Sequence, residues 1–327
     1  MIGRRRIVIA AGAALLAVPL RTRAQQAAKV HRVGFLGDAS ASGYVREVEA
    51  VRAGLRELGH VEGKNLVIEF RWADSGPERL RAMATELVSL RSEVILTHGT
   101  AGVRAALAAT RSIPIVQMDG IDPVSAGLVA SLARPGGHLT GSTSFIVEVA
   151  LKRLELLKDV APRIARVGVI MNADHPNSAG VLREMETAPR TLKLTLQAFN
   201  VRTIEDLPAA FDSVAGAKME AALIQEEPML NSNAAVVAAL AASKRLPAVG
   251  FPNFADAGGL LAYGSNRAAV YGRAAYFVDR ILKGAKPGDL PFERASTFDL
   301  VVNRKIAKAM GIPIPQTVLL RATRVIE

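Results

Sequence analysis

The residues best suited to chemistry in this chain are polar side chains that directly follow short apolar runs. The clearest case is Gly99-Thr100-Ala101, which comes just after the apolar residues 94–97 and opens an alanine-rich segment. Backbone N–H groups at the start of a helix are unpaired and lie at the positive end of its dipole, so they suit a carboxylate or another acceptor-rich ligand. The Thr100 hydroxyl adds a donor. This pattern indicates noncovalent binding.

Other apolar runs end in a similar way. A carboxylate at such a position can hold a ligand ammonium group, and an aromatic ring can stack on an apolar or aromatic ligand. The candidate ligand-binding residues are Ser40, Ser42, Gly99, Thr100, Asp119, Asp122, Asn172, Asn177, Glu226, Glu227, Phe251 and Tyr263.

Several of these candidates also have a structural interpretation as helix caps. Thr100 could cap the helix at whose start it lies, which is a common use of threonine, and Ser40 and Ser42 have the same ambiguity. Asp122 precedes Pro123, the order expected of an N-cap followed by proline at the first helical position. Both interpretations remain open for these residues.

The acidic and aromatic candidates have structural alternatives as well. At least one of Glu226 and Glu227 is expected to be an ordinary solvated loop acid. Phe251 and Tyr263 could each belong to the core. We expect Trp72, which ends another apolar run, to serve packing rather than ligand contact.

Motifs for catalysis, nucleotides and metals are absent. Residues 59–64 resemble a phosphate-binding loop, but only three residues separate Gly59 from Gly63, and the segment precedes an expected strand. No G-x-S-x-G elbow occurs, and the five histidines lie far apart. The chain has no cysteine. We therefore expect no catalysis, no cofactor and no metal, and no disulfide.

Composition favours a two-domain α/β protein. The chain has 327 residues, of which 50% are hydrophobic but only 5% aromatic, which suits helices layered on parallel strands. Its formal charge is +11, but five arginines lie in the first 24 residues, which leaves +6 for the rest. The remaining Lys and Arg are scattered among acids, so we expect no nucleic-acid binding.

The first 24 residues have the parts of an export signal. Arg4, Arg5 and Arg6 precede an apolar stretch at residues 7–20, and small residues lead to an expected cut after Ala24. The apolar stretch is shorter than the ~20 residues that a membrane-spanning helix needs. These features predict a periplasmic protein with a cleaved signal, exported by either the general or the twin-arginine route.

An internal repeat divides the rest of the chain into two lobes. The phrase Arg-Val-Gly at residues 32–34 returns at residues 166–168, each time in a buried strand-like run, and residues 112–116 are matched by residues 245–249. Parallel sheets bind ligands beyond the carboxyl ends of their strands. Two such lobes facing each other would therefore share one ligand cleft.

The periodicity predicts an α/β fold of two doubly wound parallel-sheet lobes joined by a three-segment hinge. Expected strands are residues 32–37, 65–72, 94–97, 113–118, 167–171, 194–199, 221–225, 248–251 and 298–302, with helices between them and a long helix at 267–282 that crosses back to the first lobe. The lobes are residues 29–143 plus 264–292, and 144–263 plus 293–327. The hinge segments lie near residues 141–145, 263–266 and 291–296, where they could absorb closure of the cleft.

Six phrases together carry a resemblance to a known family. They are Arg32-Val33-Gly34-Phe35-Leu36-Gly37, Gly54-Leu55-Arg56-Glu57-Leu58-Gly59, Asp122-Pro123-Val124, Leu132-Ala133-Arg134-Pro135-Gly136-Gly137, Lys152-Arg153-Leu154-Glu155-Leu156-Leu157 and Ile281-Leu282-Lys283-Gly284. Nearly the whole chain after the export segment resembles the substrate-binding proteins of ABC transporters of the tryptophan/tyrosine type. The chain departs from the family phrase after Gly137, where it has His138 and Leu139 in place of Asn and Val.

The resemblance implies a type I periplasmic-binding-protein fold that holds a small-molecule ligand between hinged lobes. It also implies delivery to a permease in the inner membrane, driven by a separate ATPase. Members of the family with a known ligand bind aromatic amino acids. We expect a monomer that closes on a small polar ligand, an amino acid or an aromatic or organic acid. A sensor that hands its ligand to a receptor is the alternative, and an enzyme is a weaker one.

Overall fold

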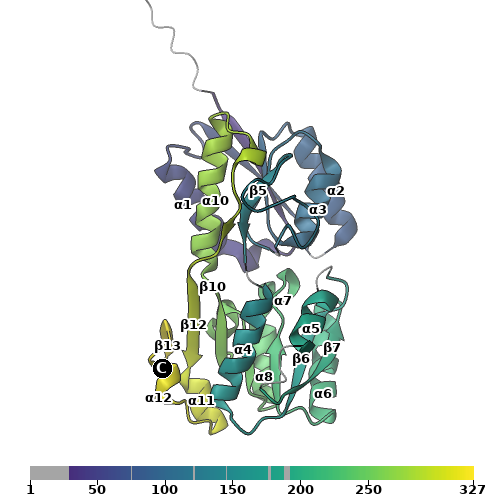
Figure 1. Ribbon diagram of the computed structural model, residues 1–327, viewed down its shortest axis with the longest axis vertical. Helices are drawn as coiled ribbons and strands as arrows, with labels where there is room; N and C mark the ends of the chain where they lie inside the picture. Colours follow the sequence, from purple (N-terminus) through teal and green to yellow (C-terminus); the bar gives the residue numbers. More distant parts are fainter. Residues whose placement is uncertain (1–28, 75, 121, 145, 176–177, 188–191) are drawn as a thin grey trace, which may run out of the picture. The chain divides into compact units, whose positions relative to one another are not determined.

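Two sheets of mostly parallel strands organise the chain, each with helices on both faces (Figure 1). The computed structural model describes residues 29–74, 76–120, 122–144, 146–175, 178–187 and 192–327. The expected export segment, residues 1–24, and the candidate Asn177 lie outside the described residues. Residues 31–327 form one unit by their contacts.

The first sheet has six strands, all paired in parallel, in the order β11-β5-β4-β3-β1-β2. These are β1 (His31–Gly37), β2 (Leu66–Trp72), β3 (Val94–Thr97), β4 (Ile115–Gln117), β5 (Leu139–Thr143) and β11 (Glu293–Arg294). The helices of this lobe are α1 (Val45–Glu57), α2 (Pro77–Ser89), α3 (Gly99–Ala109) and α10 (Arg267–Leu282). Two buried clusters cover the two faces of the sheet, one with α1 and α10 and one with α2 and α3.

The second sheet repeats this scheme and extends it. It runs β13-β12-β10-β9-β8-β6-β7, so β9-β8-β6-β7 matches β4-β3-β1-β2 of the first lobe, and β12 is antiparallel to β10. Its strands are β6 (Arg166–Asn172), β7 (Thr195–Val201), β8 (Ala221–Ile224), β9 (Ala248–Gly250), β10 (Leu261–Ser265), β12 (Phe298–Asn303) and β13 (Arg324–Ile326). The helices are α4 (Ile146–Val160), α5 (Ser178–Thr187), α6 (Leu207–Gly216), α7 (Pro228–Ser232), α8 (Ala234–Ser243), α9 (Pro252–Asp256), α11 (Arg304–Met310) and α12 (Gln316–Leu319).

The chain passes between the sheets three times, between β5 and α4, between β10 and α10, and between β11 and β12. At the first two passages, the hydroxyls of Ser144 and Ser265 lie 3.4 Å apart. The two-lobe α/β class predicted from the sequence is confirmed. One boundary needs correction: Glu293 and Arg294, which we expected in the second lobe, pair with β5 in the first sheet, because the chain adds one short edge strand before it returns.

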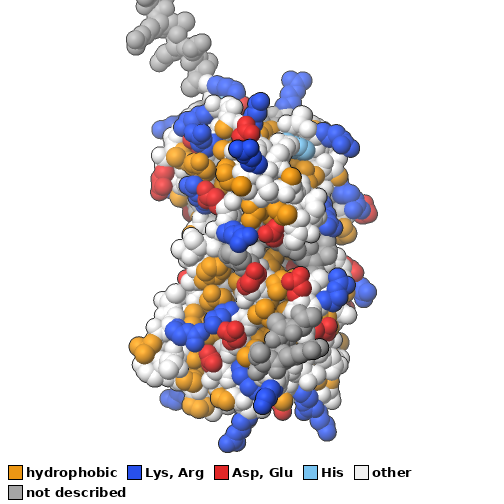
Figure 2. All heavy atoms as spheres, viewed as in Figure 1, with side chains coloured by type: hydrophobic (Ala, Val, Ile, Leu, Met, Phe, Trp, Pro, Cys, Tyr) orange, Lys and Arg blue, Asp and Glu red, His pale blue; other side chains and the backbone are white. Residues whose placement is uncertain are grey.

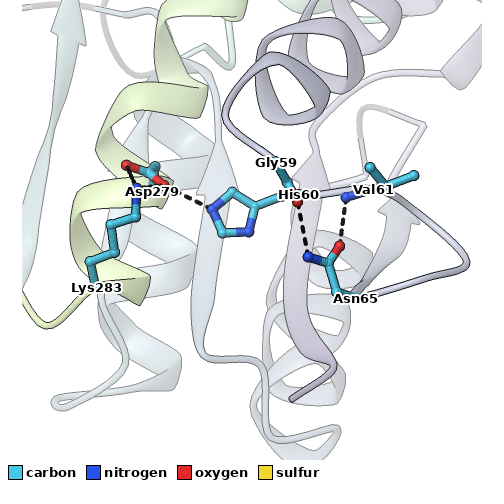
Figure 3. Close-up of polar contacts among 6 residues, drawn as sticks. All are labelled: Gly59, His60, Val61, Asn65, Asp279 and Lys283. Atoms are coloured by element: carbon cyan, nitrogen blue, oxygen red, sulfur yellow. Dashed lines mark hydrogen bonds and ion pairs between the residues drawn. The ribbon is translucent and has the colours of Figure 1, made fainter. Parts of the chain in front are cut away.

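A buried polar contact fastens α10 to the first lobe (Figure 3). Nε2 of His60 lies 2.9 Å from Oδ1 of Asp279 on α10. The loop that carries His60 is fixed by Asn65, whose side chain accepts a hydrogen bond from Val61 N at 2.7 Å and donates one to Gly59 O at 2.9 Å. The helix that arrives from the second lobe is thus anchored at its far end.

Close packing of α1 on α10 depends on small residues. A Cβ added at Gly54 would lie 2.7 Å from the carbonyl oxygen of Gly272 on α10, so the two backbones approach closely here. In Figure 1 the two helices lie side by side along one face of the first sheet. This contact fixes the start of α10, which carries a residue of the site described below.

Charged side chains are interspersed on the surface. On the face drawn in Figure 2, Lys and Arg alternate with Asp and Glu over both lobes. Among the residues that the structure describes, no helix has the length and apolar character needed to cross a membrane.

Candidate functional site

A cavity lies between the lobes, at the carboxyl ends of the strands of both sheets. Its walls come from the segments that follow β3, β4, β5, β8 and β10, together with the start of α10. The volume of this cavity is about 60 Å³. This is the position at which parallel sheets present their loops to a ligand.

Arg267 is the central cation of the cavity. It is the first residue of α10, just after Asn266, whose side chain caps the helix by accepting a hydrogen bond from Ala269 N at 2.9 Å. Only 5% of Arg267 is exposed, and its nearest ion-pair partner is Glu47 at 3.5 Å. Its Nη1 is buried without a hydrogen-bond partner among the described residues. A buried donor of this kind is costly unless a ligand accepts from it.

Aromatic rings surround this cation. The guanidinium lies over the rings of Tyr44 and Tyr271, at 4.6 and 5.6 Å from their centres, and the His98 ring is tilted against Tyr44 at 4.4 Å. Burial and the nearby Arg267 charge lower the pKa of His98 to about 3, so its imidazole is neutral. Its buried Nε2 lacks a partner in the part of the chain that the structure describes.

Three carboxylates complete the polar wall. Asp119 accepts hydrogen bonds from Gly120 N at 2.8 Å and from the Ser144 hydroxyl. Burial and the neighbouring Glu226 raise the pKa of Asp119 above its usual value. Glu226 pairs with the buried Arg153. These contacts hold the carboxylates in place beside the cavity.

Glu227, the third carboxylate, has a structural task as well. It caps α7 by accepting from Met229 N at 3.2 Å and from Leu230 N, and it also accepts from Nδ2 of Asn172 at 3.2 Å. Burial raises the pKa of Glu227 to about 7. Of the two adjacent glutamates, neither is a freely solvated loop acid.

The structure brings five of the predicted candidates to this cavity, namely Gly99, Thr100, Asp119, Glu226 and Glu227. Thr100 is the second residue of α3, whose N-cap position is His98. The interpretation of Thr100 as the cap is therefore wrong.

Other candidates lie outside this cavity. The hydroxyls of Ser40 and Ser42 face each other at 3.1 Å. Asp122 accepts from Val124 N and Ser125 N, but it caps a turn and not the expected helix, because no helix begins at Pro123. Asn172 lies in an adjoining space that is described below.

The two aromatic candidates pack inside the second lobe. Phe251 is fully buried among core side chains and packs edge-on against Phe254, with ring centroids 6.3 Å apart. Tyr263 stacks on Phe298 with centroids 5.8 Å apart. Neither lines the cavity: Phe251 belongs to a core cluster of the second lobe, and Tyr263 packs on β12. Trp72 packs on Phe35, as expected.

The sequence interpretation missed several residues of the site. Tyr44, His98, Asn231, Arg267 and Tyr271 all line the cavity. Oδ1 of Asn231 is a further buried atom with no partner among the described residues. Arg267 could have been found from its position, because it directly follows a predicted hinge segment. Nothing in the sequence alone marks Tyr271, which lies one helical turn further on.

The donor types present do not suggest a metal centre. Within the described ranges, no group of three or more His, Asp or Glu side chains is placed to hold a metal ion. The arrangement is instead that of a binding site, with one buried guanidinium, several carboxylates and a set of aromatic rings.

Comparison with known proteins gives consistent matches. A family model described as ABC transporter substrate binding protein matches residues 38–326. The chain is 26% identical over 259 residues to a tyrosine-binding protein of Clostridioides difficile (strain R20291), which covers 79% of this chain and 74% of that relative.

Solved structures agree with these matches over most of the chain. A conserved domain protein from Vibrio cholerae is 26% identical, with a TM-score of 0.85 over 91% of this chain and 100% of that one. An ABC domain from Streptococcus pneumonia, solved in complex with L-Trp, is 25% identical, with a TM-score of 0.82 over 90% of this chain and 100% of that one.

Proposed function

Because the chain belongs to the family of ABC transporter substrate-binding proteins, we propose that the molecule it captures between its lobes is a free α-amino acid. Relatives include a tyrosine-binding protein and a domain solved with L-Trp. A zwitterionic ligand needs a cation for its carboxylate and an anion for its ammonium group. The cavity offers both.

One observation carries the proposal. Nη1 of Arg267 is buried in the cavity without a partner among the described residues, and the Asp119 carboxylate lines the same space. A guanidinium binds a carboxylate with directed, charge-assisted hydrogen bonds, and Asp119 can accept from an ammonium group. Nε2 of His98 and Oδ1 of Asn231 supply a further donor or acceptor for the same ligand.

We also propose that the chain works in the periplasm as a monomer, after its N-terminal signal has been removed. Its closed, ligand-bound form would be recognised by an inner-membrane permease that a separate ATPase drives. Closure by the three crossing segments is the expected response, since a ligand that contacts both lobes favours the closed state.

A calorimetric and thermal-shift panel tests the ligand class. L-tyrosine, L-tryptophan and other L-amino acids are compared with tyramine, which lacks the carboxylate, and with 3-(4-hydroxyphenyl)propionate, which lacks the ammonium group. We expect at least one L-amino acid to raise the melting temperature, because it binds the folded state alone, and its truncated analogue to bind at least ~30-fold more weakly. Equal binding of the truncated analogues, or no response to any amino acid, would overturn the proposal.

A further inference from the structure

A second space adjoins the main cavity between the lobes and shares His175 and Glu227 with it. The volume of this second space is about 110 Å³. Pro77, Leu80 and Ala101 of the first lobe give it an apolar wall. The function proposed above makes no use of this space.

Asp38 is the notable side chain of the second space. It follows β1 directly, only 8% of it is exposed, and it faces the space. It forms no hydrogen bond or ion pair with any residue that the structure describes. A carboxylate that is this poorly solvated and has no partner among the described residues is unfavourable, so a cationic ligand would stabilise it.

The described side chains around Asp38 do not neutralise its negative charge. Glu227 lines the same space and adds a second carboxylate. Arg202 lies at the rim, where it pairs with Asp174 at 3.3 Å, and both side chains are about two-thirds exposed. Burial lowers the pKa of His175 to about 4, so it is neutral. The inner end of the space thus carries two carboxyl groups and no cation among the described residues.

The pKa values of Asp38 and Glu227 are both raised, as expected where no cation of the described residues lies close to them. Burial raises the pKa of Asp38 to about 6. Burial raises the pKa of Glu227 to about 7, and the charge of Asp38 contributes in the same direction. Ionisation of either carboxyl group is therefore unfavourable without a ligand, and a positive charge between the two groups would make it more favourable.

We propose that this space is a second subsite, formed by Asp38, Asn172 and Glu227, which receives a primary amine at the end of the ligand's side chain. The inference rests on the proposed function, since the amino-acid head occupies the main cavity. The ligand class is then an α-amino acid with a short alkyl side chain that ends in an ammonium group. Leu80 and Ala101 would pack against the alkyl part. The Asn172 amide oxygen and both Glu227 oxygens already accept hydrogen bonds within the chain, so Asp38 takes most of the charge.

An inorganic monovalent cation has the same charge and needs a separate arm of the experiment. The amine is favoured because the space shares His175 and Glu227 with the main cavity and has one apolar wall. A bare cation would instead require several oxygen ligands at once.

The test compares matched pairs of ligands that differ only by the terminal amine. Binding of L-lysine against L-norleucine, and of L-ornithine against L-norvaline, is measured by calorimetry at pH 7.5 on the full chain and on Asp38→Asn. Asp122→Asn serves as the control, because Asp122 lies in a turn outside both spaces. Titrations are repeated with sodium and with choline as the only salt cation.

We expect each diamino acid to bind at least about tenfold more tightly than its neutral partner, as a charge-assisted contact provides. Asp38→Asn should reduce this ratio to about twofold without weakening the neutral ligand, and Asp122→Asn should change neither value. A ratio near one in the unaltered chain, or a ratio that survives Asp38→Asn, would overturn the subsite while leaving amino-acid binding intact. Neutral ligands that bind only with sodium, and lose that dependence in Asp38→Asn, would assign the space to an inorganic cation and refute the amine.

A failure of the proposed function gives a different pattern. If no amino acid binds, 1,4-diaminobutane is titrated as a probe of the second space alone. Binding that Asp38→Asn removes would keep the subsite and end the amino-acid proposal, whereas no binding would end both.

Discussion

The guanidinium of Arg267 lies 4.6 Å from the centre of the Tyr44 ring, although the two residues are far apart in sequence. Tyr44 ends the first loop of the first lobe, and Arg267 is the first residue of the helix that returns from the second lobe. Arg267, the cation at the centre of the cavity, is therefore positioned at the point where the chain crosses from the second lobe to the first. A change at this position should alter ligand binding directly.

Arg267→Lys should weaken ligand binding while the chain stays folded. Lysine keeps the charge but lacks the planar fork that binds a carboxylate through two hydrogen bonds. We expect the affinity for the best amino acid to fall at least ~30-fold, the effect of losing one buried charged contact of about 2 kcal/mol. Arg273→Lys is the matched control, because Arg273 pairs with Glu293 on the surface. Calorimetry measures both, and an unchanged affinity in Arg267→Lys would remove Arg267 from the site.

A second prediction concerns closure of the lobes. A Cβ added at Gly43 would lie 2.5 Å from the hydroxyl and 2.7 Å from the Cα of Ser232 at the end of α7, so the first loop of one lobe touches the other lobe here. Gly43→Val should hold the cleft partly open, because no room exists for its side chain in the closed arrangement. We expect ligand affinity to fall at least about tenfold.

The control for this prediction is Gly180→Ala in α5, where an added Cβ meets nothing within 4 Å. Small-angle scattering with saturating ligand should give a larger radius of gyration for Gly43→Val than for the control. Equal radii and equal affinities in the two variants would mean that the lobes do not need this contact to close.

The two-sheet fold could be predicted from the sequence because each strand of the repeat is a short, continuous apolar run. The apolar runs that became β1 and β6 begin with the same three residues, and a buried parallel strand needs little more than such a run. The short helices α7 and α9 were missed because five residues give no helical periodicity. Edge strand β11, with two residues, was missed for the same reason.

The site was less predictable because side-chain direction is set by tertiary packing. Gly99, Asp119 and Glu227 follow strand ends, so the rule for parallel sheets identified them. Phe251 also follows a strand, yet its ring turns into the core and is fully buried. Tyr271 lies within a helix, and only the docking of α10 on α1 brings it to the cavity.

Two buried carboxyl groups, Asp38 and Glu227, make one contribution to the pH dependence of the ligand-free protein. The pKa of Asp38 is raised from 3.8 to about 6, and that of Glu227 from 4.5 to about 7. A raised carboxyl pKa means that the folded state binds protons more tightly than the unfolded state, so these two groups lower the free energy of unfolding as pH rises between about 4 and 7. The lowered pKa values of His98 and His175 act in the opposite direction, so the carboxyl contribution is isolated by comparing the unaltered chain with a carboxyl variant.

Asp38→Asn should reduce this pH dependence and stabilise the empty protein at pH 7.5. A shift of about two pKa units corresponds to roughly 3 kcal/mol as an upper value. Denaturant titrations at pH 5 and pH 7.5 measure the difference. The prediction is refuted if unfolding free energies of the variant and the unaltered chain change in parallel between these two pH values.

The anchor of α10 gives a prediction about stability without an effect on binding. Asp279 is 5% exposed and accepts from His60 Nε2 and from Lys283 Nζ, both at 2.9 Å. Burial raises the pKa of Asp279, but the hydrogen bonds from Lys283 and His60 outweigh it, so the net shift is downward. The stabilisation is therefore present above the ordinary carboxyl pKa and is lost as pH falls through the lower, folded-state value.

Asp279→Asn should lower the free energy of unfolding by about 1.5 to 3 kcal/mol at pH 7, the usual range for a hydrogen bond to a charged group. The deficit should begin to shrink as the pH falls below the ordinary carboxyl pKa and should vanish below the lower pKa of folded Asp279, where the unaltered carboxylate is also protonated. Asp289→Asn, at an exposed position in the same lobe, should change nothing. Because Asp279 lies at the end of α10 far from Arg267 in the helix, ligand affinity at pH 7 should stay within about twofold. A large loss of affinity with intact stability would show instead that the anchor controls the position of Arg267 rather than the strength of the fold.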